Sequence, residues 1–319
     1  GARSGAALYW STLGSFLGAL TLSMGVMQWL GVGAAVLVCT GLLLAAVPAL
    51  GRVAGARMPS AVAALAIALA ALAVNLVLPQ QLETAYATYR VEAVEIPGYV
   101  APEVFRINNS PASILDAGEP PRYARYIRRL RGLLLDELGF RGRSVLVLGA
   151  GGFTLSHREP LNHYVYVDID PAVKEIAERD FLREPVRGEF VAADARAHLR
   201  ATAARHDAVV VDVYSALTSI PAHLVTREFW RATRAALKPG GVLAANLILD
   251  RELASPYARS LLASIQAEYG ACAVEVLFRD RPQGNVLVIC AAPPAAPAEP
   301  AHPYTDERNR ADLDVLRGG

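Results

Sequence analysis

Four carboxylates in the second half of the sequence stand at or just after the ends of apolar runs, where they could do chemistry. They are Asp168, Asp170, Asp194 and Asp212. In an open parallel sheet, the carboxyl ends of the strands form the edge at which ligands bind. A carboxylate there can accept hydrogen bonds from sugar hydroxyls, or hold an ammonium group and take its proton. A single strand-end aspartate is often only a helix cap, and we expect that role for Asp170, which precedes Pro171.

The strongest pattern is the stretch SVLVLGAGGFTLSHREPLNHYVYVDIDP at residues 144–171. Residues 145–148 form a continuous apolar run, as buried parallel strands require. The glycines that follow allow a sharp turn and a close approach of a ligand to the backbone. We predict a strand, this turn, a short crossover helix and a second strand that ends at Asp168, whose carboxylate would bind a ribose. The alternative is a tight turn beside a solvated acid.

The rest of the chain predicts an α/β fold with a Rossmann-like sheet of seven strands. Further strands are predicted at residues 189–192, 208–213, 242–246, 274–278 and 286–291, and helices at 122–138, 173–177 and 229–237. Lys238-Pro239-Gly240-Gly241 predicts a helix stop followed by a turn. We divide the chain into membrane helices (1–80), a small β region (83–117) with a turn at Asn108, the catalytic domain (118–292) and a tail (293–319).

The amino-terminal part predicts membrane helices. Residues 4–51, a run of 48, contain no Asp, Glu, Lys, Arg or His. A membrane helix needs about 20 apolar residues, so we predict spans at 7–27 and 32–50, a turn near 28–33, and a third span at 59–78. A buried hairpin of a soluble protein is disfavoured because these segments lack a polar face. A signal peptide is disfavoured because it has one apolar region, not three.

Composition narrows the function further. The net charge of +1 gives no reason to expect a nucleic-acid partner. Cys39 lies in a predicted span, Cys272 and Cys290 resemble strand residues, and we predict neither a disulfide framework nor a metal site. The six histidines are interpreted as ordinary polar residues. The sequence begins at Gly1 without a Met, which leaves open whether further residues precede it.

The orientation in the membrane is open. The positive-inside rule places Arg52 and Arg57 in the cytoplasm, and with three spans it would put the large domain outside. A domain built for an adenosyl compound belongs in the cytoplasm, where such compounds are made. Two arginines are weak evidence, so we predict an integral protein of the bacterial inner membrane type with a cytoplasmic catalytic domain.

Several blocks resemble the spermidine/spermine synthase family, the polyamine aminopropyltransferases. The resemblance covers residues 83–290 and is closest at VLVLGAGGFTL (145–155), VDIDP (167–171), ADA (193–195), HDAVVVDVYSALTSIPAHLVTREFW (206–230) and ALKPGGVL (236–243). The apolar amino-terminal part is similar to that of membrane-fused members. The resemblance implies a seven-stranded methyltransferase-like domain joined to a small β domain. It also implies transfer of the aminopropyl group of decarboxylated S-adenosylmethionine, a co-substrate, to an amine such as putrescine.

The family's site residues carry over by motif position. The implied cofactor-binding residues are Gly149, Gly151, Asp168 at the ribose, and Asp194 with Ala195 at the adenine. The implied catalytic residues are Asp212, which would position the acceptor amine and take its proton, and Tyr214. Tyr214 and the segment 219–226, which resembles the family's gate, would close over the site and exclude water. No metal is implied.

The amine-recognition positions depart from the family pattern. Gly152 stands where the family has the aspartate that holds the aminopropyl amine, and Ser215 stands where it has a second aspartate for the acceptor. Asn108-Asn109-Ser110 and Tyr123-Ala124-Arg125 replace the family's acceptor-side segments. The implied substrate-binding residues are therefore Tyr123 and Ser215, in altered surroundings.

Two other functions stay open. One is an S-adenosylmethionine-dependent methyltransferase on the same fold, which Gly152 favours because an acid there would repel the carboxylate of that compound. The other is a non-catalytic adenosyl-binding membrane protein, which the presence of Asp212 disfavours. The expected partners are a small amine substrate and membrane lipid. A lipid-borne amine acceptor and a homodimer are left open.

Overall fold

The computed structural model describes residues 2–54, 62–63, 66–67, 69–70, 73, 82–202, 205–214, 220–278, 280–291, 304–307, 309 and 311. The chain divides into two compact units, Gly1–Thr88 and Tyr89–Gly319. Each unit is described by itself.

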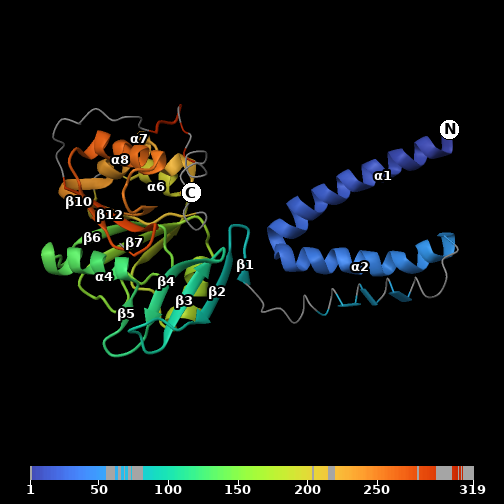
Figure 1. Ribbon diagram of the computed structural model, residues 1–319, viewed down its shortest axis with the longest axis horizontal. Helices are drawn as coiled ribbons and strands as arrows, with labels where there is room; N and C mark the ends of the chain where they lie inside the picture. The colour runs from blue at the N-terminus through green and yellow to red at the C-terminus, as the bar shows by residue number, and fades with distance from the viewer. Residues whose placement is uncertain are drawn as a thin grey trace. The chain divides into compact units, whose positions relative to one another are not determined.

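The first unit consists mainly of helices (Figure 1), and many of their apolar side chains, such as Leu8, Trp10 and Phe16, are exposed. These are α1 (Ala2–Thr21), the π-helical η1 (Leu22–Met27) and α2 (Gln28–Ala54), and a short strand β1 (Leu82–Glu83) follows. Of the described residues, Ser4–Met27 is the one helical stretch long and apolar enough to cross a membrane, and Gly31–Ala46 is a shorter apolar helix. The predicted turn near 28–33 corresponds to Gly31, which interrupts α2 with φ 84° and ψ 173°. The third predicted span lies largely outside the described residues.

The second unit begins with an antiparallel sheet in the order β2-β3-β4-β5. Its strands are β2 (Thr88–Ala93), β3 (Pro102–Ile107), β4 (Ser110–Asp116) and β5 (Arg122–Tyr123). Asn108 and Asn109 join β3 to β4, and both have positive φ, as a two-residue hairpin turn requires. The helix predicted from residue 122 begins later, because Arg122 and Tyr123 pair with β4 as a strand. Helix α4 (Arg125–Arg131) then continues into the π-helical η2 (Gly132–Glu137).

The main sheet has seven strands in the order β11-β12-β10-β9-β6-β7-β8. The strands are β6 (Ser144–Leu148), β7 (His163–Asp168), β8 (Glu189–Ala192), β9 (His206–Val211), β10 (Leu237–Asp250), β11 (Ala273–Val276) and β12 (Gln283–Ala291). Strands β10, β9, β6, β7 and β8 are parallel, whereas β12 runs antiparallel to both β10 and β11. The predicted α/β fold with a seven-stranded sheet is confirmed. The strand order reverses at β6, which places a binding crevice at the carboxyl ends of β6 and its neighbours.

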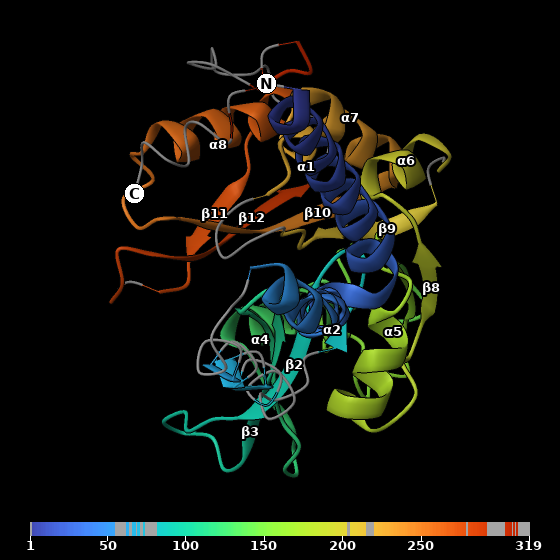
Figure 2. The same ribbon diagram turned by 90° about the vertical axis from the view of Figure 1, so that its right-hand side faces the viewer.

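Helices cover both faces of this sheet. Figures 1 and 2 show α6 (Ala195–Arg200), α7 (Arg227–Ala236) and α8 (Pro256–Tyr269) on one face and α4 on the other. Helix α5 (Val173–Ile176), extended by the π-helical η3 (Ala177–Leu182), lies on the same side as α4 in Figure 2. Phe229 and Trp230 of α7 are completely buried in the same hydrophobic cluster as Leu146 and Val209 of the sheet, so this face holds the main core.

Two local predictions are wrong and one helix was missed, although α7 ends at Ala236, as the predicted helix stop requires. Residues 149–162 form turns, not the predicted short helix, because Phe153 and Arg158 have positive φ, which an α-helix excludes. Strand β10 continues through the predicted turn at Lys238-Pro239-Gly240-Gly241, with a register shift that absorbs it. Helix α8 was not predicted, although Ser255 caps it by accepting a hydrogen bond from Ala258 N.

The structure also pairs two cysteines that the sequence left unpaired. Cys272 and Cys290 form a disulfide, with their Cα atoms 4.5 Å apart. They come together because β11 and β12 are antiparallel, with Ala273 opposite Ile289. The prediction of no disulfide is therefore wrong. Their separation of 18 residues in the sequence does not indicate that the two cysteines lie on paired strands at the edge of the sheet.

Candidate active site

The turn after β6 and the turn after β9 lie against each other at the carboxyl edge of the sheet. Gly149 has φ 87°, and a Cβ atom at this position would lie 2.1 Å from the carbonyl oxygen of Asp212. Asp212 N in turn donates to Leu148 O at 2.8 Å. Only glycine permits this approach, which brings the predicted nucleotide turn and the predicted catalytic carboxylate to one place.

A cavity of about 200 Å³ opens at this edge. It gathers seven of the nine predicted site residues, namely Gly149, Gly151, Asp168, Asp194, Ala195, Asp212 and Tyr214. Further lining residues are Ser110, Tyr126, His223, Asn246, Ile248 and Asn285. The Ser110 hydroxyl is buried and has no hydrogen-bond partner among the described residues, so a polar ligand could satisfy it.

Asp168 stands at the end of β7 with its carboxylate fixed by backbone amides. Its Oδ2 accepts a hydrogen bond from Ala150 N at 2.9 Å, and its Oδ1 accepts one from Asp170 N at 3.1 Å. Burial raises the pKa of Asp168 above its usual value, although the Ala150 amide acts in the opposite direction. Each carboxylate oxygen has two lone pairs, so both can still accept a hydroxyl of a ribose.

Asp194 follows β8 and caps helix α6. Its Oδ1 accepts a hydrogen bond from Ala197 N at 2.8 Å, while its Oδ2 lies 3.0 Å from His223 Nε2. Burial alone would raise the pKa of Asp194, but the hydrogen bonds from His223 and Ala197 outweigh it, and the pKa is lowered. The carboxylate is therefore ionised at neutral pH and able to accept from an amino group in the cavity.

Asp212 has neutral hydrogen-bond partners. Asn246 Nδ2 donates to Asp212 Oδ1 at 2.8 Å, and Asn285 Nδ2 donates to Asn246 Oδ1 at 2.9 Å. The Tyr214 hydroxyl donates to Asn246 O at 2.9 Å. Burial raises the pKa of Asp212 to about 6, against the opposing effect of Asn246 and Tyr126. Such a carboxylate is ionised at neutral pH yet basic enough to take a proton.

Of the two predicted substrate-binding residues, the structure describes Tyr123 alone, and it does not line this cavity. Tyr123 is buried on β5, where its hydroxyl lies 2.9 Å from His157 Nδ1, and it borders a different cavity. Ser215 lies outside the described residues. Asp170 holds the start of α5 by accepting from Ala172 N and also accepts from the Tyr89 hydroxyl at 2.7 Å, in keeping with a structural role. Among the residues that the structure describes, no group of three or more His, Cys, Asp or Glu could hold a metal ion.

Comparisons with known proteins identify the relatives of this chain. No family model matches it. It is 35% identical over 140 residues to the polyamine aminopropyltransferase of Vibrio vulnificus, covering 41% of this chain and 46% of that protein. It is 32% identical over 257 residues to the polyamine aminopropyltransferase of Mycobacterium tuberculosis, covering 72% of this chain and 49% of that protein. The chain is a relative of the polyamine aminopropyltransferases. The predicted family resemblance is thereby confirmed.

The fold comparison agrees. The crystal structure of a probable spermidine synthase from Corynebacterium glutamicum superposes with a TM-score of 0.56 at 21% identity, covering 67% of this chain and 80% of that one. At this identity the match supports the fold alone. The chain spans about half the length of these two curated relatives, so its activity as a whole protein is argued below as a proposal.

In this chain, the space beside Gly152 is filled by neighbouring side chains. A Cβ atom there would lie 2.5 Å from Phe181 Cε1 and 2.9 Å from Ser113 Cβ. Gly152 N donates to Ser113 Oγ at 2.9 Å, which fixes the loop in this position. An aspartate therefore does not fit at residue 152 without displacing Phe181, and the departure seen in the sequence is built into the packing.

The sequence did not indicate the contacts of several residues that line the cavity of this chain. His223 belongs to the segment 219–226 that was expected to close over the site, but it was interpreted as an ordinary polar residue, and its contact with Asp194 was not predicted. Asn246 on β10 and Asn285 on β12 lie far from Asp212 in the sequence. The order of the strands in the sheet brings Asn246 to Asp212 and Asn285 to Asn246. The one sequence signal is Asn246, which interrupts an apolar strand, because a polar residue inside a buried strand needs a partner. Asn285 precedes the apolar run 286–291 and gives no such signal.

Proposed function

We propose that the chain is a membrane-anchored polyamine aminopropyltransferase. It would transfer the aminopropyl group of decarboxylated S-adenosylmethionine to an amine acceptor such as putrescine. The observation that carries this proposal is Asp212, a carboxylate with a pKa of about 6 in the same cavity as the nucleoside-binding candidates Gly149, Asp168 and Asp194. The similarity to curated aminopropyltransferases supports it.

The chemistry assigns each residue a task. Asp212 would hold the acceptor ammonium, whose reference pKa is about 10, and accept the proton that must leave before attack. The amine nitrogen forms a bond to the carbon beside the sulfonium, the carbon–sulfur bond breaks, and its electrons neutralise the sulfur. The thioether that remains is methylthioadenosine. Asp168 would fix the ribose and Asp194 the adenine amino group, so that both reactants meet in line.

One observation favours a second candidate, an S-adenosylmethionine-dependent methyltransferase. The family's carboxylate for the aminopropyl ammonium has no counterpart at Gly152, where Phe181 and Ser113 occupy the space. A site without that carboxylate would tolerate the carboxylate of intact S-adenosylmethionine better.

A donor comparison separates the two. The full-length chain is incubated with either decarboxylated or intact S-adenosylmethionine and a panel of amines, and the nucleoside product is identified by chromatography. We expect methylthioadenosine from the decarboxylated donor, and a thermal shift larger with that donor than with the intact one. Release of S-adenosylhomocysteine from the intact donor would instead establish the methyltransferase and remove the aminopropyl proposal.

The proposal also concerns location. The apolar helices would contact membrane lipid, and the catalytic unit would face the cytoplasm, where adenosyl compounds are made. A homodimer is compatible with this arrangement. Two observations argue for the opposite side. The positive-inside rule places Arg52 in the cytoplasm, which with three spans would put the catalytic unit outside. The Cys272–Cys290 disulfide also favours the outside, because disulfides are rare in the cytosol.

A further inference from the structure

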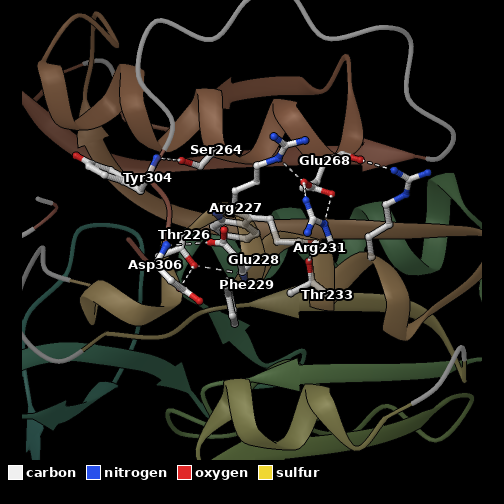
Figure 3. Close-up of polar contacts among 12 residues, drawn as sticks. Thr226, Arg227, Glu228, Phe229, Arg231, Thr233, Ser264, Glu268, Tyr304 and Asp306 are labelled. Atoms are coloured by element: carbon white, nitrogen blue, oxygen red, sulfur yellow. Dashed lines mark hydrogen bonds and ion pairs between the residues drawn. The ribbon is translucent and has the colours of Figure 1, made fainter. Parts of the chain in front are cut away.

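The described residues 304–307 return to the helical layer formed by α6, α7 and α8 and are fixed there by main-chain contacts (Figure 3). Arg227 N donates to Tyr304 O at 2.7 Å, and Tyr304 N donates to Ser264 Oγ of α8 at 2.8 Å. Tyr304 is buried in the core of the unit. The sequence had predicted only a tail here, but backbone groups held in this way mark a packed segment.

The Asp306 side chain forms the next contact in this segment. Its carboxylate accepts two hydrogen bonds from the Arg196 guanidinium, one of them 2.6 Å long, and a third from the Thr226 hydroxyl at 3.0 Å. Its main-chain nitrogen donates to Glu228 Oε2 at 3.1 Å, as Figure 3 shows. The paired arrangement with Arg196 fixes the plane as well as the position of the guanidinium.

Arg196 connects Asp306 to the wall of the cavity. The same guanidinium that binds Asp306 also donates to His223 O at 3.1 Å. The His223 ring then lies 3.0 Å from Asp194 Oδ2, and both residues line the cavity. Asn309 Nδ2 donates to Ala222 O, so a second contact holds the same loop. A continuous series of contacts thus runs from Asp306 through Arg196 and His223 to Asp194.

We propose that Asp306 is a positioning residue for the nucleoside wall of the cavity. By fixing Arg196, it holds the loop at residues 221–224 and keeps the His223 ring against Asp194. Without the carboxylate, Arg196 loses its paired acceptor and can leave His223 O, and Asp194 then loses the contact that orients its Oδ2. The inference rests on the proposed function for the identity of the ligand, an adenosyl compound. The cavity geometry itself does not depend on it.

The test compares two surface ion pairs of the same kind. Asp306→Asn keeps the size and an acceptor for Thr226 but removes the charge that binds Arg196. The matched control is Glu103→Gln on β3, because Glu103 also accepts a paired contact, from Arg183 at 2.7 and 2.8 Å, and does not line the cavity. Calorimetry with methylthioadenosine gives the dissociation constant of each full-length variant, and kinetics with the decarboxylated donor gives KM and kcat.

We expect Asp306→Asn to weaken methylthioadenosine binding by about tenfold, the usual order for one charged hydrogen bond. The donor KM should rise by a similar factor while kcat stays within twofold, and Glu103→Gln should change neither. Arg196→Gln should have the same effect, and the double variant should be no worse than either single one, because both act through one contact series.

The outcomes that overturn the proposal are distinct. Wild-type affinity in Asp306→Asn, or an equal loss in Glu103→Gln, reduces the Asp306–Arg196 contact to a surface ion pair without an effect on the cavity. A wild-type chain that binds neither methylthioadenosine nor S-adenosylmethionine removes this inference together with the proposed function. Binding by the wild type with no change in Asp306→Asn removes the inference alone.

Discussion

At the scale of single residues, the pKa of Asp212 depends on the fact that its hydrogen-bond partners carry no charge. A nearby Arg or Lys would lower the pKa of the carboxyl and weaken it as a base. Asn246 donates a hydrogen bond without bringing a charge, and Asn285 holds Asn246 in the orientation needed for this. Burial can then dominate, which raises the pKa of Asp212 to about 6. These asparagines therefore preserve the basicity of the carboxylate while fixing its position.

The first prediction concerns removal of this base. Asp212→Asn keeps the shape of the side chain but cannot accept the proton of the acceptor amine. We expect turnover to fall by about 10²-fold or more, with methylthioadenosine affinity nearly unchanged. The control is Asp207→Asn at the opposite end of β9, where Asp207 binds Lys238 at 2.7 Å, away from the cavity. A wild-type rate in Asp212→Asn with any accepted amine would place the base elsewhere.

The second prediction concerns pH. Because the ionised form of Asp212 is the base, kcat/KM should decline as the pH falls through about 6, the pKa of this carboxyl in the fold. The same carboxyl has a pKa of about 3.9 in the unfolded chain. Its protonated form therefore favours folding below about pH 4, and this contribution is lost as the pH rises to about 6. A pH–rate profile shows the first effect, and urea unfolding of wild type and Asp212→Asn at pH 4.5 and 7.5 shows the second. An acidic limb that persists in the residual activity of Asp212→Asn would assign it to another group.

At the scale of elements, the sequence predicts the parallel strands well and their surroundings poorly. Continuous apolar runs such as residues 145–148 and 208–211 are short and rich in valine, which favours a strand covered on both faces over a buried helix, so these strands could be predicted. The turn after β6 was misjudged because the positive φ values at Phe153 and Arg158 leave no mark in the sequence. Likewise, α8 mixes small and polar residues along its length, which hides a helical stripe.

The candidate site shows the same limit. Asp168, Asp194 and Asp212 were predictable because each stands next to its own strand in the sequence. Tyr123 was named as the aromatic substrate-binding residue, whereas the structure lines the cavity with Tyr126. Tyr123 lies on β5 and Tyr126 on α4, which follows it directly. The change from strand to helix alters which side chains face the sheet, and the sequence did not show where it occurs. Contacts across the sheet, such as that of Asn246 with Asp212, depend on strand order and could not be predicted locally.

The third prediction concerns the β11–β12 edge, where Cys272 and Cys290 are joined. A disulfide that closes a loop of about 15 residues stabilises a protein by about 3 kcal/mol, mainly through the unfolded state. Reduction should therefore lower the free energy of unfolding by about this amount, measured by urea titration with and without reductant. Thiol counts should rise from one, Cys39, to three after reduction and unfolding. A Cys39→Ser variant, as the control, should show the same difference. Equal midpoints in both conditions would contradict a stabilising role.

At the scale of the whole molecule, the proposed reaction and the disulfide indicate opposite sides of a membrane for the proposed catalytic unit. The proposed co-substrate is made in the cytoplasm. The disulfide suits an oxidising compartment, and Arg52 at the end of the charge-free run suits the cytoplasmic end of a helix. A cytoplasmic unit is compatible with the disulfide only if the two cysteines are thiols in the cell and pair on isolation. The chain's orientation therefore decides whether the proposed reaction has access to its donor.

The fourth prediction decides this by labelling. Val100 is 87% exposed, so Val100→Cys in a Cys39→Ser background provides an accessible thiol without touching the cavity. In intact bacterial spheroplasts a membrane-impermeant maleimide should not label this variant, whereas permeabilised spheroplasts should give full labelling. The labelled chain should remain in the membrane pellet after alkaline carbonate, because the apolar stretch Ser4–Met27 would hold it in lipid. Labelling in intact spheroplasts would place the unit outside, where the disulfide is expected and decarboxylated S-adenosylmethionine is not. In that case the cavity would have to bind a different ligand. The aminopropyl proposal would fail, even if the purified protein binds the nucleoside, because the donor would be absent from that side of the membrane.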